Sequence, residues 1–316
     1  MLVSHAPELA DGNRNREILT RFFHTMSFGE VAVGGFFLLS GYLIVQSWLS
    51  SPQILEFLKK RVLRIYPAFI VATLVSAFVV GPLAADPIRY FSSFWLGGLI
   101  KSLLRLEAPV TPDVFLGTPY PVVNGAMWTI TYEFKCYLLV LLLGITGIIK
   151  RRSVWLIITV VILNFLILQK LGFLSMKDDA FLRLASYFFI GGCFFLYKEE
   201  IVFNKKMACA MSILLLAGMF SSHGAELAFA TAGAYLLFYV ALTPIQALKD
   251  FNKYPDVSYG TYLYGWPVQK LLLWYFPTIS PWYMLFLSIA ICLSLGAISW
   301  FVIEKPALSL KTVKVS

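Results

Sequence analysis

Nine long apolar stretches constrain the fold of this chain more than any other feature of its sequence. They cover residues 30–49, 66–83, 127–149, 153–171, 181–197, 206–221, 225–243, 257–276 and 282–303. Most have about 17–25 residues, the length of a helix that crosses the hydrocarbon core of a bilayer. A helix satisfies its own backbone hydrogen bonds, so apolar segments of this length cross a membrane as helices. The sequence therefore predicts an all-α, polytopic bundle of about nine transmembrane helices.

The composition excludes several other classes of protein. Hydrophobic residues make up 59% of the 316 residues and charged residues only 14%, whereas a soluble domain has about 25% charged residues. Too few polar side chains are present to cover a globule in water, which excludes a soluble cytosolic enzyme and a disordered or fibrous chain. The net charge of +9 is typical of cytoplasmic anchoring rather than of nucleic-acid binding. We expect one membrane domain over residues 1–316, without an appended soluble domain.

Basic residues in the connections predict the orientation of the spans. One set of connections, with the C-terminal tail, contains Lys59, Lys60, Arg61, Arg64, Lys150, Arg151, Arg152, Lys198, Lys205, Lys206, Lys249, Lys253, Lys305, Lys311 and Lys314. The opposite connections at 222–224 and 277–281 contain no lysine or arginine. The basic set and the C-terminus are therefore expected in the cytoplasm.

The N-terminal region does not fit a complete bundle of this orientation. With nine spans the N-terminus lies outside, residues 6–29 form a polar external loop, and no signal peptide precedes them. One further helix upstream, ending near Val3, would give ten spans and place both termini inside. We therefore expect an N-terminal truncation; the alternative is a nine-span protein with a short translocated tail. In the second external loop, 84–126, residues 88–104 are expected to form an amphipathic interfacial helix.

The cysteines and histidines do not form a disulfide framework or a metal site. The apolar runs contain all four cysteines, Cys136, Cys193, Cys209 and Cys292. The histidines are scattered, at His5, His24 and His223. The patterns GxxxxGKS/T and HExxH are also missing, so ATP-driven transport and zinc proteolysis lose support. We expect no metal and no bound cofactor.

Glu133 and His5 are the candidate catalytic residues. Glu133 lies inside the apolar stretch 127–149, where a carboxylate costs about 2.5 kcal/mol or more unless it faces a cavity or a partner. Lys135, two positions on, points about 200° away and is a poor partner. His5 lies toward the same external face, and a histidine can take a hydroxyl proton near neutral pH when Glu133 or another acid orients it. The alternatives are a snorkelling carboxylate and a lone loop histidine.

Arg61 and Arg64 are the candidate anion-binding residues. They are three positions apart, so they share one face if the segment is helical. Two guanidinium groups can bind phosphates through forked hydrogen bonds. Pro67 would fit the first turn of the next span. The alternative for the pair is plain cytoplasmic anchoring.

Hydroxyl side chains in and beside the spans are candidates for a polar path. They are Ser40, Tyr66, Ser258, Tyr259 and Tyr262. Around Ser40 the alternative is a packing notch formed with Gly41. For residues 258–267 the alternative is an aromatic belt at the membrane interface.

Six short motifs, each weak alone, together resemble the acyltransferase-3 family of bacterial membrane O-acyltransferases. They lie in order at residues 3–5, 36–42, 61–67, 128–133, 258–263 and 304–306, and thus extend over nearly the whole chain. The resemblance implies a ten-helix fold that takes an acyl group, usually acetyl, from cytoplasmic acyl-CoA. The acceptor that the resemblance implies is a hydroxyl of an extracytoplasmic glycan or similar molecule. The resemblance also implies a protein of the bacterial inner membrane that has no nucleic-acid partner.

The resemblance also implies roles for individual residues. His5 matches the essential first-helix histidine of the family, Arg61 and Arg64 match its inner-face arginine pair, and Glu133 matches its membrane-embedded acid. Two family features are missing: an arginine eleven positions before the histidine, which would precede Met1, and a histidine where Gly265 and Trp266 stand. A transporter or flippase for lipid-linked sugars fits a polytopic chain with a buried acid equally well. A non-catalytic membrane partner is a third alternative.

Overall fold

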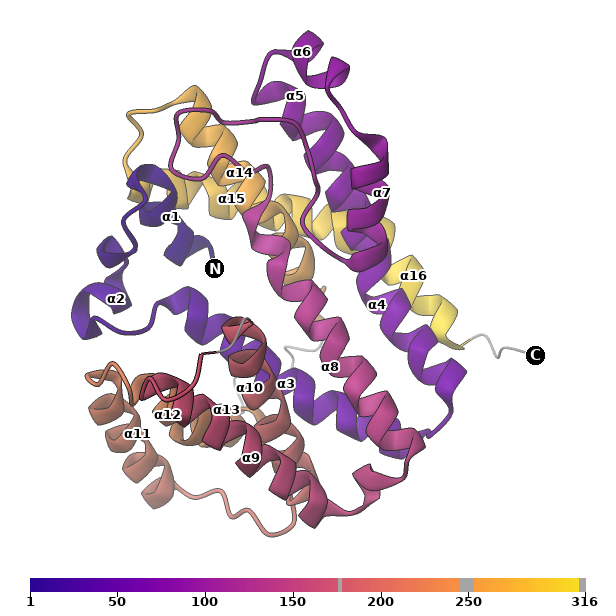
Figure 1. Ribbon diagram of the computed structural model, residues 1–316, viewed down its shortest axis with the longest axis vertical. Helices are drawn as coiled ribbons and strands as arrows, with labels where there is room; N and C mark the ends of the chain where they lie inside the picture. Colours follow the sequence, from indigo (N-terminus) through magenta and orange to yellow (C-terminus); the bar gives the residue numbers. More distant parts are fainter. Residues whose placement is uncertain (176–177, 245–252, 313–316) are drawn as a thin grey trace. The chain divides into compact units, whose positions relative to one another are not determined.

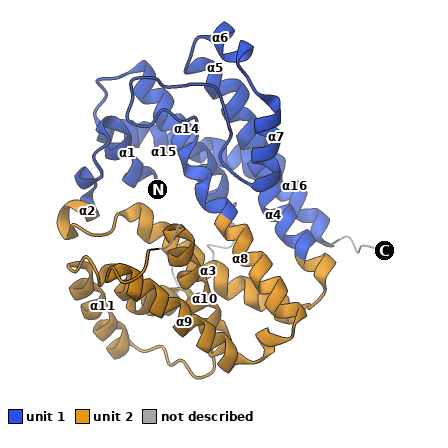
Figure 2. Ribbon diagram, in the orientation of Figure 1, with its two compact units in different colours: residues 1–18, 58–131, 254–316 blue, residues 19–57, 132–253 orange. Residues whose placement is uncertain are grey.

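The regular secondary structure in the described part of the chain is helical. A computed structural model describes residues 1–175, 178–244 and 253–312, and within these ranges no residue is in a strand (Figure 1). Chain packing divides the protein into two compact units (Figure 2). Unit 1 contains residues 1–18, 58–131 and 254–316, and unit 2 contains residues 19–57 and 132–253. The predicted all-α class is confirmed, while Lys249 and Lys314 of the orientation argument lie outside the described residues.

Seven helical segments are long and apolar enough to cross a membrane. They are Phe28–Ser50, Ile54–Leu83, Gly125–Ile145, Arg152–Lys170, Asp179–Leu196, Ala225–Leu242 and Pro281–Ser309. Each overlaps one of the nine predicted spans. The other two predictions fall on α11 (Lys205–Met219), which has 15 residues, and on α14 (Ser258–Tyr275), which has 18 but includes Gln269 and Lys270. The chain is a multi-pass membrane protein.

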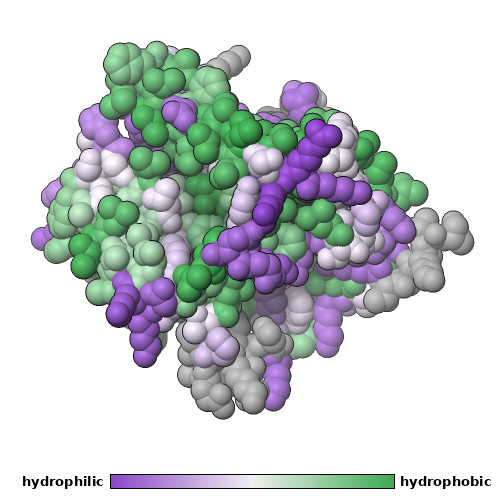
Figure 3. Space-filling view, turned by 90° about the horizontal axis from the view of Figure 1, so that it is seen from below, coloured by the Kyte–Doolittle hydropathy of each residue, from purple (hydrophilic) through white to green (hydrophobic). Residues whose placement is uncertain are grey.

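Apolar side chains lie on the surface as well as in the core. Leu142, Ile157 and Phe286 are all exposed, and hydrophobic side chains cover wide areas of the face drawn in Figure 3. In water a surface of this kind drives association. In a bilayer the same surface faces hydrocarbon of similar polarity, which agrees with the apolar stretches of the sequence.

Unit 2 is organised around two closely packed helices, α3 (Phe28–Ser50) and α10 (Asp179–Leu196). A Cβ atom on Gly41 would lie 1.9 Å from the Phe188 carbonyl oxygen, and one on Gly191 would lie 1.9 Å from the Leu38 carbonyl oxygen. Glycines that let two backbones approach in this way are typical of membrane helix interfaces. The packing notch that the sequence allowed at Ser40 and Gly41 is present.

The remaining helices of unit 2 surround this pair. On α9 (Arg152–Lys170) the buried Trp155 donates from Nε1 to the Phe189 oxygen at 2.9 Å and stacks on the Phe189 ring. α12 (Ala225–Ala228), η5 (Phe229–Gly233) and α13 (Ala234–Leu242) form one continuous helix, in which η5 has π-helical hydrogen bonding. α3 starts at a capping box, because Ser27 and Glu30 bond each other's backbone N–H groups.

In unit 1 the helix that carries the arginine pair is longer than predicted. The sequence predicted a span from residue 66 with Pro67 in its first turn, and this boundary is wrong. α4 (Ile54–Val75) begins twelve residues earlier and continues through η2 (Ser76–Val80) and α5 (Gly81–Leu83). Residues 58–64 are mostly Leu, Lys and Arg, which are good helix formers, so the helix extends through the basic segment and Pro67 lies in its interior.

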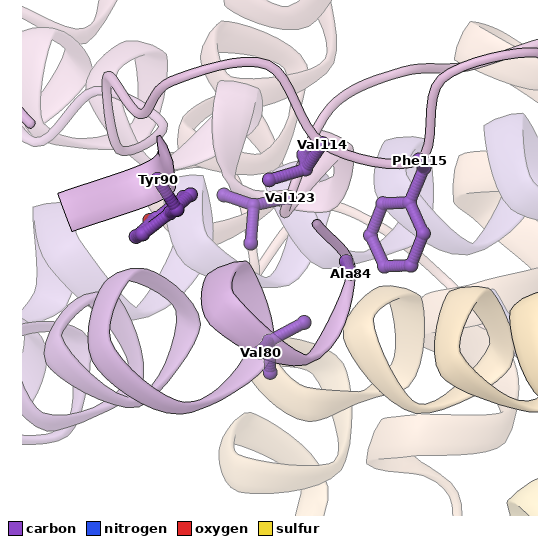
Figure 4. Packing of buried hydrophobic residues seen from close by; sticks show 6 residues of the cluster. All are labelled: Val80, Ala84, Tyr90, Val114, Phe115 and Val123. Atoms are coloured by element: carbon purple, nitrogen blue, oxygen red, sulfur yellow. The ribbon is translucent and has the colours of Figure 1, made fainter. Parts of the chain in front are cut away.

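The long loop of unit 1 folds onto this helix. The single interfacial helix predicted at 88–104 is wrong in its extent, because α6 (Pro87–Ser92) and α7 (Leu96–Arg105) are separate. Residues 107–124 then return without a helix, as the proline density predicts. A hydrophobic cluster under the loop contains Val80, Ala84, Tyr90, Val114, Phe115 and Val123 (Figure 4). Tyr90 also donates to the Ala77 oxygen at 2.7 Å, which fixes the loop to the helix.

The N-terminal region is helical where the sequence predicted a polar loop over residues 6–29. It forms α1 (Leu2–Asp11), η1 (Arg14–Arg16) and α2 (Ile18–Phe23). α1 buries Ala6 and Leu9 almost completely, and it ends at Gly12, whose φ of 78° is left-handed. The loop prediction followed the polar residues and missed the spacing of these two apolar ones.

The C-terminal part of unit 1 consists of α14, α15 (Pro281–Ser299), η8 (Trp300–Glu304), α16 (Lys305–Ser309) and η9 (Leu310–Thr312). α14 and α15 approach closely at glycine, since a Cβ atom on Gly260 would lie 2.8 Å from the Gly296 Cα. α1 is attached to this pair, because Gln269 of α14 donates from Nε2 to the Leu2 oxygen at 3.0 Å.

Candidate functional site

His5, Glu8 and Arg14 form a connected polar triplet in unit 1. His5 and Glu8 are three positions apart on α1, so they share one face, and His5 Nδ1 lies 3.3 Å from Glu8 Oε2. Arg14 donates from Nε to Glu8 Oε1 at 2.6 Å. The Glu8 side chain is only 3% exposed. A carboxylate at Nδ1 favours the tautomer that carries its proton there, which leaves Nε2 with a lone pair.

Glu8 stays ionised over the whole physiological range. Burial alone would raise its pKa, but the hydrogen bonds from His5 and Arg14 and the positive charge of Arg14 outweigh burial and lower the pKa to about 2. The carboxylate is therefore a permanent negative charge beside the imidazole. It can stabilise the imidazolium that forms when His5 accepts a proton.

The second nitrogen of His5, Nε2, is the one that could accept a proton. His5 Nε2 is buried and has no hydrogen-bond partner among the residues that the structure describes. The ring contacts the Trp266 ring edge-on, with centroids 5.0 Å apart and an interplanar angle of 78°. An imidazole that is oriented at one nitrogen and unpartnered at the other has the arrangement that general base catalysis requires.

The segment 118–129 holds the helix that carries Trp266. It runs along α14 and contacts it at successive turns: Lys270 Nζ lies 2.6 Å from Thr118 Oγ1, and Asn124 donates to the Leu263 oxygen at 2.9 Å. Tyr262 bonds both Thr129, at 2.6 Å, and the Ala126 carbonyl. These contacts make segment 118–129 and α14 a rigid support for the His5 ring.

Replacing Glu8 by glutamine should destabilise the protein in a pH-dependent way. The pKa of Glu8 is lowered from its ordinary value of 4.5 to about 2, so ionised Glu8 stabilises the folded state above pH 4.5. That contribution, about 3 kcal/mol, is lost as the pH falls from 4.5 toward 2. Thermal midpoints of the wild type and Glu8→Gln in detergent should differ most above pH 5 and converge below pH 3. A difference that does not change with pH would contradict this role.

Arg64 of α4 is bound by two carboxylates of unit 1. Its Nη2 lies 2.8 Å from Asp256 Oδ2, and its Nη1 lies 3.7 Å from Glu304 Oε2. Glu304 is buried and accepts a hydrogen bond from Ser299 at 2.8 Å. Arg64 thus connects α4 to the start of α14 and to η8, a structural role that the spacing of the two arginines did not reveal.

Other cations gather beside this arginine. Burial lowers the pKa of Lys311, and the positive charges of Lys60 and the two arginines of α4 lower it further, to about 8. Cations close enough to affect each other in this way form a local excess of positive charge, which attracts phosphate groups. Arg61 and Arg64 both lie on α4, as the helical reading of their spacing predicts.

The other candidates of the sequence have different surroundings. Glu133 is buried in unit 2, where Tyr137 donates a hydrogen bond to it, and Lys135 instead lies 3.9 Å from Asp178. The acid beside His5 within unit 1 is therefore Glu8, which the sequence analysis missed because it placed residue 8 in a loop. On a helix, the i, i+3 spacing of the two residues would have identified it.

The predicted polar-path residues lie in both units. Ser40 is buried on α3 of unit 2. In unit 1, Tyr66 lies 3.3 Å from the Leu104 oxygen and Tyr259 lies 3.2 Å from the Ile65 oxygen. Ser258 bonds Asp256, the carboxylate that holds Arg64. The hydroxyls of the three predicted tyrosines, Tyr66, Tyr259 and Tyr262, therefore each bond a backbone or side-chain group of a neighbouring segment.

Comparison with known proteins identifies the family of the chain. Residues 1–303 match the acyltransferase-3 family, described as an acyltransferase domain. The chain is similar to an O-acetyl transferase of Shigella phage Sf6, with 26% identity covering 92% of this chain and 88% of the relative. It is also similar to nodulation protein 10 of Rhizobium leguminosarum bv. viciae, with 27% identity over 92% and 85% of the two chains. No solved structure matches.

A shorter similarity points to the same class. Acyltransferase MdmB of Streptomyces mycarofaciens is 29% identical over 39% of this chain and 30% of its own. The family match extends over all of α1 to α15, and so includes both the His5 triplet and the arginine pair. The chain therefore belongs to the acyltransferase-3 family of membrane acyltransferases.

Proposed function

We propose that this protein transfers an acyl group, most simply acetyl, from cytoplasmic acyl-CoA to a hydroxyl of an extracytoplasmic glycan or similar acceptor. The observation that carries the proposal is the His5 triplet, in which Glu8 orients one imidazole nitrogen and the other is unpartnered among the described residues. The Shigella phage relative is named an O-acetyl transferase, which supports an oxygen acceptor and an acetyl donor.

The chemistry requires one base and no redox change. His5 Nε2 removes the proton of the acceptor hydroxyl, whose oxygen attacks the carbonyl carbon of the thioester. The tetrahedral intermediate collapses, the carbon–sulfur bond breaks, and the departing CoA sulfur takes the proton back from His5. Glu8 stabilises the imidazolium during this exchange. A variant of the same reaction acylates His5 first, and it would be detected as an acyl-histidine in protein quenched with acid after a brief exposure to acyl-CoA.

Acyl-CoA provides phosphate groups for the cations at the other end of the site. Lys60, Arg61 and Lys311 belong to the basic set that the positive-inside rule assigns to the cytoplasm. We place the C-terminus in the cytoplasm and the protein in the bacterial inner membrane on the same argument. The phosphates would bind these side chains, and the acyl end would extend toward His5.

The two arginines should differ when each is replaced by alanine. Arg61→Ala is expected to raise the KM for acyl-CoA about tenfold, because a charge-assisted phosphate contact is lost. Arg64→Ala should also lower the thermal midpoint, since it leaves the buried Glu304 without its cation. Steady-state kinetics and melting curves on the same preparations make the comparison. A midpoint of Arg64→Ala equal to that of the wild type would contradict the structural role of Arg64.

The reaction itself can be measured in nanodiscs. Purified protein is given radiolabelled acetyl-CoA and a bacterial glycan, and both free CoA thiol and alkali-labile ester on the glycan are counted. Acyl transfer produces the two in equal amounts. A flippase of lipid-linked sugars would move its substrate in proteoliposomes without releasing CoA, and that result would replace the proposal.

A further inference from the structure

Four charged side chains of unit 2 form a network that the proposed chemistry does not use. Arg183 of α10 reaches Glu30 of α3 at 3.1 Å and Glu226 of α12 at 3.3 Å. Lys170, the last residue of α9, lies 2.8 Å from the same oxygen of Glu226. The network thus joins the ends of four helices, and its two cations balance its two carboxylates. We call these four residues the ion network.

Three buried polar side-chain atoms of unit 2 have no hydrogen-bond partner within the described residues. They are Tyr187 OH, the second carboxylate oxygen of Glu226 and Gln169 Oε1, and in the described part of unit 2 these are all the buried side-chain atoms of this kind. Tyr187 follows Arg183 by one helical turn, and Gln169 precedes Lys170. A buried group without a partner costs about 1–3 kcal/mol. Two of the three belong to Tyr187 and Glu226, side chains that both adjoin Arg183, and these two atoms call for a ligand or ordered water.

The wall behind Tyr187 is aromatic and irregular. The Phe229 ring meets the Tyr187 ring edge-on, with centroids 5.5 Å apart. Gly34 leaves the room for both, since a Cβ atom there would lie 2.6 Å from Phe229 and 3.0 Å from Tyr187. Phe229 also begins the π-helical segment η5, three residues after Glu226. π-Helical turns occur frequently at functional sites, which is an observation independent of the unpartnered atoms.

We propose that this part of unit 2 binds an uncharged, hydroxyl-rich portion of the acceptor glycan. Because the ion network is neutral, it offers no net charge to an anion. The unpartnered atoms beside Arg183 are one carboxylate oxygen of Glu226, which accepts, and the Tyr187 phenol, which both donates and accepts, and they match the O–H groups of a sugar. The helix ends lie beside residues 171–175 and 222–224, on the face that the alternation of the predicted spans places outside. The inference rests on the proposed function, because it assigns the acceptor of that reaction.

Tyr187→Phe tests the site with the removal of one atom. The acceptor KM should rise about fivefold to tenfold, the effect of one lost hydrogen bond to a ligand. Acyl-CoA hydrolysis without acceptor should not change. The thermal midpoint should stay the same or rise, because the deleted hydroxyl has no partner within the described residues. If the hydroxyl had a merely structural role, its removal would lower the thermal midpoint.

Tyr235→Phe is the matched control in the same unit. The Tyr235 hydroxyl donates to the Val202 oxygen at 2.9 Å and accepts from the Asn204 N–H at 3.2 Å. Its removal should lower the thermal midpoint and leave the acceptor KM unchanged. The two variants together separate a hydroxyl that serves a ligand from one that serves the fold.

A binding measurement keeps this inference distinct from the proposed reaction. Glycan is titrated into the detergent-purified wild type and Tyr187→Phe without acyl-CoA, and the heat of binding is recorded. Weaker binding by the variant supports the site, even if no ester forms with acetyl-CoA and the proposed function fails. Equal binding and an equal acceptor KM in both proteins would overturn the inference and show that the two atoms beside Arg183 hold ordered water only.

Discussion

His5→Ala is expected to reduce ester formation by a factor of about 10² to 10⁴, the range that a positioned general base contributes. The variant loses the unpartnered Nε2 and keeps the surrounding frame, because Trp266 is held by its own contacts with segment 118–129. Initial rates with radiolabelled acetyl-CoA and glycan in nanodiscs measure the effect. The KM for acyl-CoA should change little, since the cations of α4 do not depend on the imidazole.

His223→Ala is the control for this experiment. His223 is exposed in the connection that precedes α12, and among the residues that the structure describes its ring bonds the neighbouring Ser222. Its replacement should leave the rate within twofold of the wild type. If His5→Ala retained more than a tenth of the wild-type rate while folded, His5 would not be the base, and the proposed mechanism would have to use another group.

Gly41→Val is expected to prevent unit 2 from folding stably. A Cβ atom at this position would lie 1.9 Å from the Phe188 oxygen and 3.1 Å from the Gly192 nitrogen. Both are backbone atoms of α10, so no flexible side chain can move aside. Overpacking a core against side chains costs about 1–3 kcal/mol, and forcing two backbones apart should exceed that range. We expect a thermal midpoint at least 10 °C lower, or loss of the protein from the membrane fraction.

Gly35→Ala provides the comparison on the same helix. A Cβ atom at Gly35 would have nothing within 4 Å, and alanine is favoured over glycine in a helix by about 1 kcal/mol. This variant should therefore melt at the same temperature as the wild type or slightly higher. If Gly41→Val and Gly35→Ala melted alike, the close approach of α3 and α10 would be wrong.

Much of the fold could be read from the sequence, because bilayer thickness sets the length of an apolar helix. This constraint locates the helices at 28–50, 152–170 and 225–242 within a few residues of their observed ends. The constraint does not locate helices that are polar or too short to cross a bilayer. α4 extends through the basic residues 59–64. α1 is a short helix of ten residues, whose buried residues include the polar Ser4 and Glu8 as well as Ala6 and Leu9. Hydropathy reports burial in lipid and does not detect either feature.

The candidate site was predictable to the extent that it depends on local spacing. His5 and the arginine pair were identified from motifs, and the arginines share a helix as their spacing predicts. The contacts that give these residues their roles come from remote segments: Asp256 reaches Arg64 across 192 residues, and Trp266 supports His5. No spacing rule within one segment can predict such partners. Glu8 is an exception, because it contacts His5 within one helix. The sequence analysis missed this contact because the polar composition of residues 6–29 indicated a loop.

The attachment of His5 to α14 has a consequence for the protein during its synthesis. His5 is among the first residues made, whereas Trp266 and the helix that carries it leave the ribosome near the end. Segment 118–129, which holds α14, is translated in between. The imidazole therefore acquires this contact only after α14, which ends at Tyr275, has been translated. Under the proposed mechanism, a chain that stops before α14 would carry His5 without the Trp266 contact and should not consume thioester.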